Sequence, residues 1–124
     1  MPAKPFVPSE NFEQKALVRW LEPYAQAGKL RFAHIPNETP TTAIAAKEQQ
    51  RKGVRRGVPD MLMIVGRKLF FIELKRTKGG MVSKQQEDWI ASMRLCGVDA
   101  HVCEGFKAAQ ALIQNVLKEQ GVSL

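Results

Sequence analysis

Two short apolar runs near the middle of the chain, DMLMIV (60–65) and LFFIELK (69–75), are separated only by a Gly-Arg-Lys turn. Their length, their β-branched and aromatic content and the turn between them predict two adjacent strands of a hairpin. Both runs are apolar enough to be buried on both faces, so other elements must cover the sheet that contains them. The hairpin is therefore the centre of the predicted fold.

The remaining sequence supplies helices and strands on either side of this hairpin. Helical periodicity and capping residues mark helices at about 10–27, 41–53, 83–96 and 106–120, and apolar runs mark strands at 30–35 and 98–103. The resulting order predicts an α/β fold in which a mixed β-sheet is flanked by α-helices. We expect a flexible arm over residues 1–8, which is rich in proline, and one domain over residues 9–124.

Charge is the main deviation in composition. The 124 residues carry 19 Lys and Arg against 12 Asp and Glu, a formal net charge of +7. Such an excess in a small domain often indicates a polyanionic partner, because neutralised phosphates release condensed counterions. The alternative is a basic protein that is merely soluble, and the position of the charges has to decide between the two.

The chain contains no apolar run long enough to span a membrane, and its first residues, MPAKPFVPSE, lack the apolar stretch of a signal peptide. Its two cysteines, Cys96 and Cys103, are too few for a disulfide scaffold and lack the spacing of a zinc site. We therefore expect an intracellular, cytoplasmic protein with no membrane partner.

Acidic residues are poor strand formers, so Asp60 and Glu73 at the ends of the two apolar runs need an explanation. Strand alternation places Glu73 and Lys75 on one face, and pairing around the turn lets Asp60 approach them. Carboxylate oxygens in this arrangement suit Mg²⁺ or Mn²⁺, with the backbone carbonyl of Leu74 as a further ligand. Lys75 would then orient or deprotonate a metal-bound water. The simpler alternative is an ion pair between Glu73 and Lys75.

A basic segment, KEQQRKGVRRGVPD (47–60), leads directly into Asp60. Gly53 and Gly57 are expected to keep it mobile. A flexible basic loop beside an acidic metal site is suited to gripping the phosphates of DNA, although a solvated run of charge is the alternative. The candidate DNA-binding residues are Lys47, Arg51, Lys52, Arg55 and Arg56.

Two further polar residues lie on faces predicted to be buried. Glu13, on the inward side of the first helix, can supply a third carboxylate, with Glu10 as the competitor and a surface position open to either. Gln86 lies on the apolar face of its helix and also completes a capping-box pattern with Ser83. It either serves that cap or points into the site to bond Lys75 or a metal-bound water.

The motif PD-x12-E-x-K, the acidic residue on a preceding helix and the S-x-x-Q that opens the following helix resemble the PD-(D/E)xK nuclease superfamily. The segments RGVPDMLMI, LFFIELK and VSKQQEDWIASMRLCGVDAHVC, together with HIPNE (34–38), are similar to its virus-type replication-repair nuclease (VRR-NUC) domain. The resemblance runs from about Ser9 to Cys103. It implies a restriction-endonuclease-like fold and catalytic residues at the positions Asp60, Glu73, Lys75, Glu13 and, in preference to Gln85, Gln86.

The resemblance also implies an activity and a partner. Compact members of this family are similar to phage nucleases and to archaeal-type Holliday junction resolvases, which act as dimers. We therefore expect a homodimeric endonuclease, dependent on Mg²⁺ or Mn²⁺ and encoded by a phage in a bacterial host. It would hydrolyse backbone phosphodiesters of branched DNA such as Holliday junctions or flaps. The alternatives are a restriction-like nuclease that reads sequence and a catalytically silent DNA-binding module.

Overall fold

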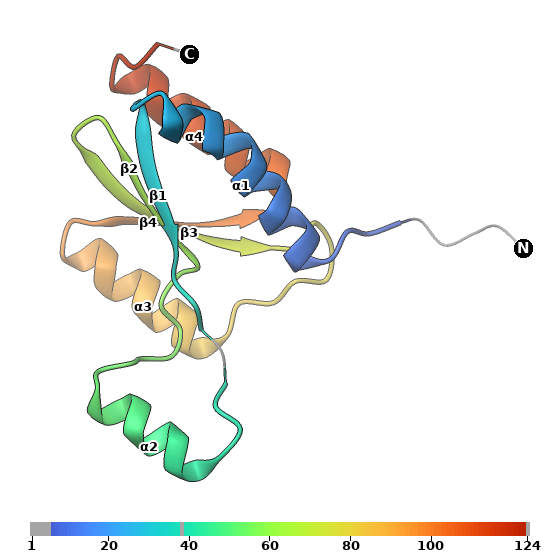
Figure 1. Ribbon diagram of the computed structural model, residues 1–124, viewed down its shortest axis with the longest axis vertical. Helices are drawn as coiled ribbons and strands as arrows, with labels where there is room; N and C mark the ends of the chain where they lie inside the picture. Colours follow the sequence, from blue (N-terminus) through green and yellow to red (C-terminus); the bar gives the residue numbers. More distant parts are fainter. Residues whose placement is uncertain (1–5, 38, 124) are drawn as a thin grey trace, which may run out of the picture.

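The computed structural model describes residues 6–37 and 39–123, which form four helices and a four-stranded sheet (Figure 1). In chain order the elements are α1 (Glu10–Gln26), β1 (Leu30–His34), α2 (Ala43–Arg51), β2 (Met61–Val65), β3 (Lys68–Lys75), α3 (Lys84–Leu95), β4 (Asp99–Glu104) and α4 (Phe106–Glu119). Each lies where a local pattern predicts it, and the expected α/β fold is confirmed.

The sheet has the order β1-β2-β3-β4. The first two pairings are antiparallel and the pairing of β3 with β4 is parallel, so the sheet is mixed as predicted. The hairpin of β2 and β3 pairs Met61 with Ile72. This register places Asp60, just before β2, next to Glu73 in β3.

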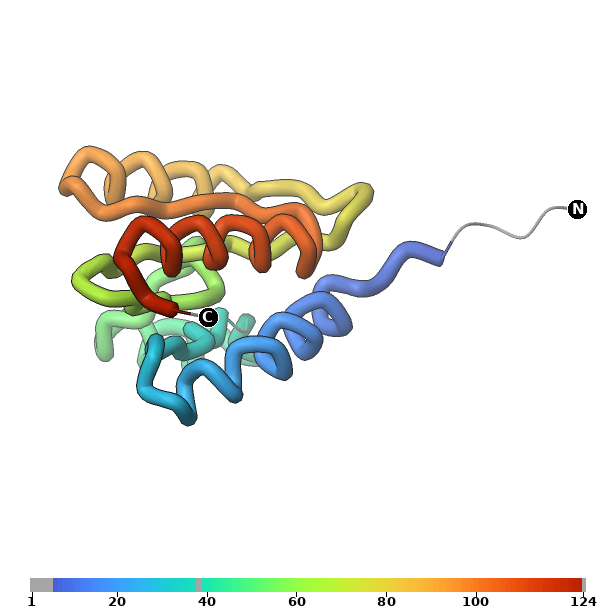
Figure 2. The backbone as a smooth tube through the Cα atoms, turned by 90° about the horizontal axis from the view of Figure 1, so that it is seen from above, coloured from blue at the N-terminus to red at the C-terminus, as the bar shows by residue number. Residues whose placement is uncertain are grey.

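Helices α1 and α4 lie together over one face of the sheet, and α3 packs beside β4 (Figures 1 and 2). The core between α1, α4 and the sheet includes Leu17, Met63, Phe70, Ile72 and Ile113, each with no exposed surface. The expectation that both strands of the hairpin are buried on both faces is only partly correct. Ile64 in β2 is 39% exposed and Leu69 in β3 is 43% exposed, because α3 covers the sheet at its β4 side.

Helix α2 stands away from the sheet (Figure 1). None of its nine described residues is buried, and Ile44 is 83% exposed. The helix begins at a cap in which the Thr42 hydroxyl accepts a hydrogen bond from the backbone N–H of Ala45 at 3.1 Å. A helix this short is marginal in water by itself, so it is held mainly by its cap and by the segments at its two ends.

The two cysteines are expected to react very differently. Cys103 is buried under α4, and burial raises the pKa of its thiol to about 11, whereas Cys96 is exposed after the last turn of α3. We expect iodoacetamide at about pH 8 to modify Cys96 in the folded protein and Cys103 only after unfolding, measured by peptide mass spectrometry. The Cys96→Ser variant, the control, should remain unlabelled while folded, and labelling of its Cys103 would contradict this packing.

Two of the sequence-based expectations are only partly covered by the described residues. The division into an arm over residues 1–8 and a domain over 9–124 stays a prediction, because residues 1–5 lie outside the described part of the chain. Across the described part, no helix has the length and apolar character needed to cross a membrane.

Candidate functional site

Asp60 is fixed between β1 and β3 by its backbone and by its side chain. Its carbonyl oxygen accepts a hydrogen bond from the backbone N–H of Ile35 at 2.6 Å. The same oxygen lies 3.0 Å from Nδ1 of His34. Its carboxylate Oδ2 accepts the backbone N–H of Leu74 at 3.0 Å. The carboxylate is therefore held beside β3, where Glu73 begins the ELK motif.

Glu73 is completely buried, and neither of its carboxylate oxygens has a hydrogen-bond partner among the residues described. The Lys75 ammonium, itself only 7% exposed, lies 3.4 Å from Oε2. Burial and the neighbouring Asp60 carboxylate raise the pKa of Glu73 to about 8, and Lys75 acts in the opposite direction. A buried carboxylate without a full set of partners is costly, and a cation beside it would lower that cost.

Glu10, the first residue of α1, is the third acidic residue of this cluster. One carboxylate oxygen from each of Glu10, Asp60 and Glu73 lies within 4.8 Å of the others. Three oxygen donors at this spacing fit a hard divalent cation, and the unsatisfied oxygens of Glu73 supply the reason for one to bind. The acidic triad could therefore bind a metal ion.

Glu13 lies outside this triad, and its predicted part in metal binding stays a prediction. Its carboxylate is buried and accepts hydrogen bonds from the backbone N–H of Phe106 and, at 3.3 Å, from the hydroxyl of Thr77. These two bonds direct it toward the start of α4, whereas Glu10, one turn earlier, reaches Asp60. Glu10, the competitor that the sequence offers, is the helix carboxylate of the acidic triad.

Gln86 takes the role that the sequence left open as an alternative. The side-chain oxygen of Gln86 accepts a hydrogen bond from the backbone N–H of Ser83 at 2.9 Å, and the backbone N–H of Gln86 donates to the Ser83 hydroxyl at 3.2 Å. This capping box occupies the side-chain oxygen, and the predicted role of Gln86 in bonding Lys75 or a metal-bound water stays a prediction. Leu74 has its side chain in the core, and its carbonyl oxygen stays a predicted ligand.

The basic segment is more tightly anchored than its glycines suggest. Gly57 is buried with φ +91°, and a Cβ there would lie 2.5 Å from the backbone carbonyl of Gln85. This packing joins the end of the segment to the first turn of α3, beside a small cavity of about 200 Å³ lined in part by Arg56. The expected mobility therefore does not extend to Gly57.

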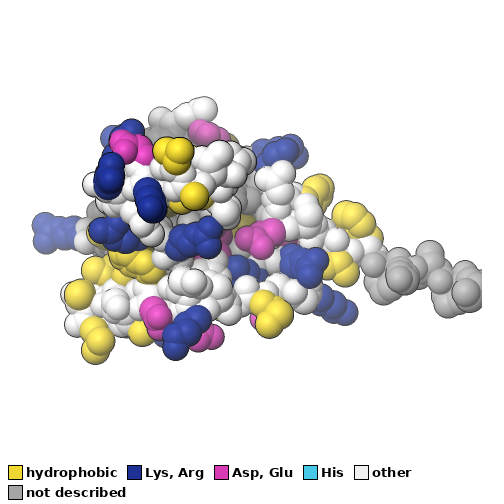
Figure 3. Space-filling view, turned by 90° about the horizontal axis from the view of Figure 1, so that it is seen from below, with side chains coloured by type: hydrophobic (Ala, Val, Ile, Leu, Met, Phe, Trp, Pro, Cys, Tyr) yellow, Lys and Arg dark blue, Asp and Glu magenta, His cyan; other side chains and the backbone are white. Residues whose placement is uncertain are grey.

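The cationic side chains of this segment are exposed as predicted. Figure 3, which views the molecule from the side where α2 protrudes, shows Lys and Arg side chains spread over the surface. Lys52 lies 3.9 Å from Glu48 in an exposed ion pair, and Arg55 donates to the backbone carbonyls of Gln50 and Val54. The candidate DNA-binding residues, all exposed, are Lys47, Arg51, Lys52, Arg55 and Arg56.

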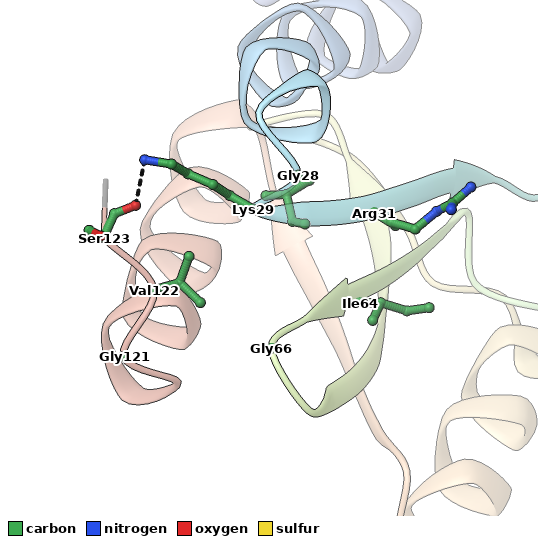
Figure 4. Close-up of a pocket in the computed structure, with 9 residues that line it drawn as sticks. Gly28, Lys29, Arg31, Ile64, Gly66, Gly121, Val122 and Ser123 are labelled. Atoms are coloured by element: carbon green, nitrogen blue, oxygen red, sulfur yellow. Dashed lines mark hydrogen bonds between the residues drawn. The ribbon is translucent and has the colours of Figure 1, made fainter.

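A larger cavity, of about 480 Å³, lies away from these residues (Figure 4). It is bounded by the turn between α1 and β1, the turn between β2 and β3, and the end of α4, where the Lys29 ammonium donates to the carbonyl of Ser123 at 2.8 Å. No member of the acidic triad lines it. The candidate site lies instead at the end of the sheet where β2 begins and β3 ends.

The sequence and fold match one known family. A family model described as the VRR-NUC domain matches residues 7–107. A solved structure described as a VRR_NUC domain protein gives a TM-score of 0.72 at 21% identity, covering 91% of this chain and 91% of that chain. Another, described as a VRR_NUC domain, gives 0.57 at 19% identity over 82% of this chain and 95% of that chain. No curated protein matches the sequence.

Proposed function

Since the chain belongs to the VRR-NUC domain family, a family of nucleases, we propose that it is a divalent-metal-dependent endonuclease that hydrolyses the phosphodiester backbone of DNA. The observation that carries the proposal is the cluster of Glu10, Asp60 and Glu73 with the Lys75 ammonium beside it. An ion-pair role for Lys75 alone would leave both oxygens of buried Glu73 poorly satisfied.

In this proposal the carboxylates of the cluster bind the metal ion and Lys75 acts on the attacking water. Glu10, Asp60 and Glu73 hold Mg²⁺ or Mn²⁺, with the Leu74 carbonyl as a further ligand. When bound, the ion stabilises negative charge on the scissile phosphate and lowers the pKa of a coordinated water. Lys75 orients the attacking water or, as the neutral amine, accepts its proton, and the resulting ammonium then offsets charge that develops on the phosphate.

DNA would be held mainly through its phosphates. The basic segment presents cations on an exposed helix and loop that end at Asp60. A DNA strand bound to this segment would therefore run toward the acidic cluster. Phosphate contacts carry no sequence information, so we propose that selectivity comes from branching and flexibility of the DNA. A chain of 124 residues offers little surface for a four-way junction, and we propose that a homodimer presents two sites to it.

Cleavage assays with the purified protein test this function. The substrates are a four-way junction, a flap and a linear duplex of the same sequence, each with Mg²⁺, Mn²⁺ or a chelator. The proposal expects products from the branched substrates only when metal is present. Cutting at a fixed sequence regardless of branching would indicate a restriction-like enzyme, and binding without products under every condition would indicate a silent DNA-binding module. Light scattering during size-exclusion chromatography tests the homodimer.

Neutralising the basic segment is expected to weaken DNA binding and its dependence on salt. In a variant with Gln at Arg51, Lys52, Arg55 and Arg56, the slope of log affinity against log salt should decrease in magnitude by up to about 3.6, since each lost phosphate contact removes about 0.9. Fluorescence anisotropy with a labelled junction measures the slope. The matched control neutralises four exposed cations of α1 and α4, namely Lys15, Arg19, Lys107 and Lys118. Equal slopes for the two variants would remove the segment from the interface.

A further inference from the structure

Glu13 connects three parts of the chain near the acidic triad. It lies on α1 and is only 7% exposed. Its carboxylate accepts the backbone N–H of Phe106, the first residue of α4, and the hydroxyl of Thr77, which follows β3. Buried carboxylates are retained where their bonds determine a local arrangement, so these two bonds point to a role beyond solubility.

The start of α4 depends on this carboxylate. The N-cap residue is Gly105, which has no side chain to cap the helix and adopts φ +88°. Glu13 supplies the missing acceptor from another helix, and its charge is favourable at the positive end of α4. A Cβ at Gly105 would lie 2.7 Å from the Thr77 hydroxyl and 3.3 Å from Oε2 of Glu13, so the junction admits only glycine.

The same junction also contacts the two segments that carry site residues, the end of β3 with Lys75 and the first turn of α1 with Glu10. The backbone N–H of Gly105 donates to the carbonyl of Lys75 at 2.7 Å, which fixes the end of β3. On α1, Glu13 lies one turn after Glu10, the first helical residue, and its backbone N–H donates to the carbonyl of Ser9 at 3.0 Å. Helix ends fray unless they are tied down: the Ser9 hydroxyl caps this turn by accepting the backbone N–H of Phe12, and the Glu13 side chain links the turn to α4.

We propose that Glu13 is a positioning residue: by anchoring the first turn of α1 to the start of α4, it holds the Glu10 carboxylate at the metal site. The inference rests on the proposed function, because it takes Glu10 as a metal ligand. In this role Glu13 is not itself a ligand and touches no substrate. Partners of this kind, one step removed from a metal, commonly change metal affinity when they are replaced.

A double-mutant cycle tests the proposal through the affinity for Mn²⁺, measured by titration calorimetry on folded protein without DNA. We expect Glu10→Gln and Glu13→Gln each to weaken Mn²⁺ binding by about 10-fold. The double variant should be no weaker than Glu10→Gln alone, because Glu13 acts through Glu10. Thr77→Val, which removes one of the two bonds, should give a smaller loss and serves if Glu13→Gln does not fold. Glu22→Gln, an exposed position on the same helix, is the matched control and should bind as wild type does.

The outcomes separate this inference from the proposed function. If Glu10→Gln weakens Mn²⁺ binding and both Glu13→Gln and Thr77→Val bind as wild type does, the positioning role is wrong and the ligand set stands. An additive loss in the double variant also overturns it, because Glu13 would then act independently of Glu10. If Glu10→Gln itself binds Mn²⁺ normally, the proposed ligand set fails and the inference fails with it.

Discussion

Replacing Asp60 by Asn is expected to lower the rate of DNA cleavage about 10³-fold while DNA binding persists. The amide keeps the shape of the carboxylate, and its oxygen can still accept the backbone N–H of Leu74, which the carboxylate now accepts at 3.0 Å. What the variant loses is one negative charge of the acidic triad. A loss of activity with the fold intact would therefore report on the chemistry of the site.

Lys75→Met should give a loss of similar size for a different reason. The variant keeps the apolar stem of a side chain that is only 7% exposed and removes the ammonium 3.4 Å from Glu73. Single-turnover cleavage of a labelled junction measures both variants, and anisotropy measures their DNA binding. Glu119→Gln, at the exposed end of α4, is the control and should cleave as wild type does. Wild-type rates for Asp60→Asn and Lys75→Met would show that the triad is not the catalytic centre.

Replacing Glu73 by Gln is expected to stabilise the metal-free protein above neutral pH. Burial raises the pKa of Glu73 to about 8, from an ordinary value near 4.3. The stability that such a group contributes is fully present below its ordinary pKa and is lost as the pH rises through its folded-state pKa. Between about pH 5 and pH 8, wild type should therefore lose about 3.5 kcal/mol that the variant retains.

Bound metal should make wild type more stable than Glu73→Gln. Saturating Mn²⁺ is expected to stabilise wild type by about 3 kcal/mol at a hundredfold excess over the dissociation constant, whereas Glu73→Gln should gain little. Chemical denaturation at both pH values, with chelator and with Mn²⁺, gives all the free energies required. The difference between the two proteins cancels the titration of other groups. Parallel curves at all pH values would show that Glu73 is not a strained carboxylate in the folded state.

Much of the fold follows from local patterns. The turn between β2 and β3 is so short that the two strands pair as neighbours, and alternation then places Glu73 and Lys75 on one face. Asp60 lies beside them for the same reason. These three residues are close together because they belong to one hairpin. Residues that face each other across a hairpin can be predicted from their spacing in the sequence.

The identity of the third carboxylate does not follow from such patterns. Glu10 and Glu13 are three residues apart and lie on neighbouring positions of the same helical face, so periodicity cannot separate them. Glu13 is drawn to the backbone N–H of Phe106, which is 93 residues away along the chain and has no capping side chain of its own. The only local sign of this need is the glycine before α4, and a missing cap does not reveal which distant residue will supply it.

Gln86 and Gly57 show the same division between local and distant information. The capping-box pattern identifies Ser83 as a partner of Gln86, and that capping box is present at the start of α3. Gly57, with Gly53, predicts a mobile segment, but the approach of α3 makes Gly57 a point of tight contact. Local spacing thus dictates which elements form and which neighbouring side chains share a face. Contacts between elements far apart along the chain depend on how helices dock on the sheet, and packing against the whole core sets that arrangement.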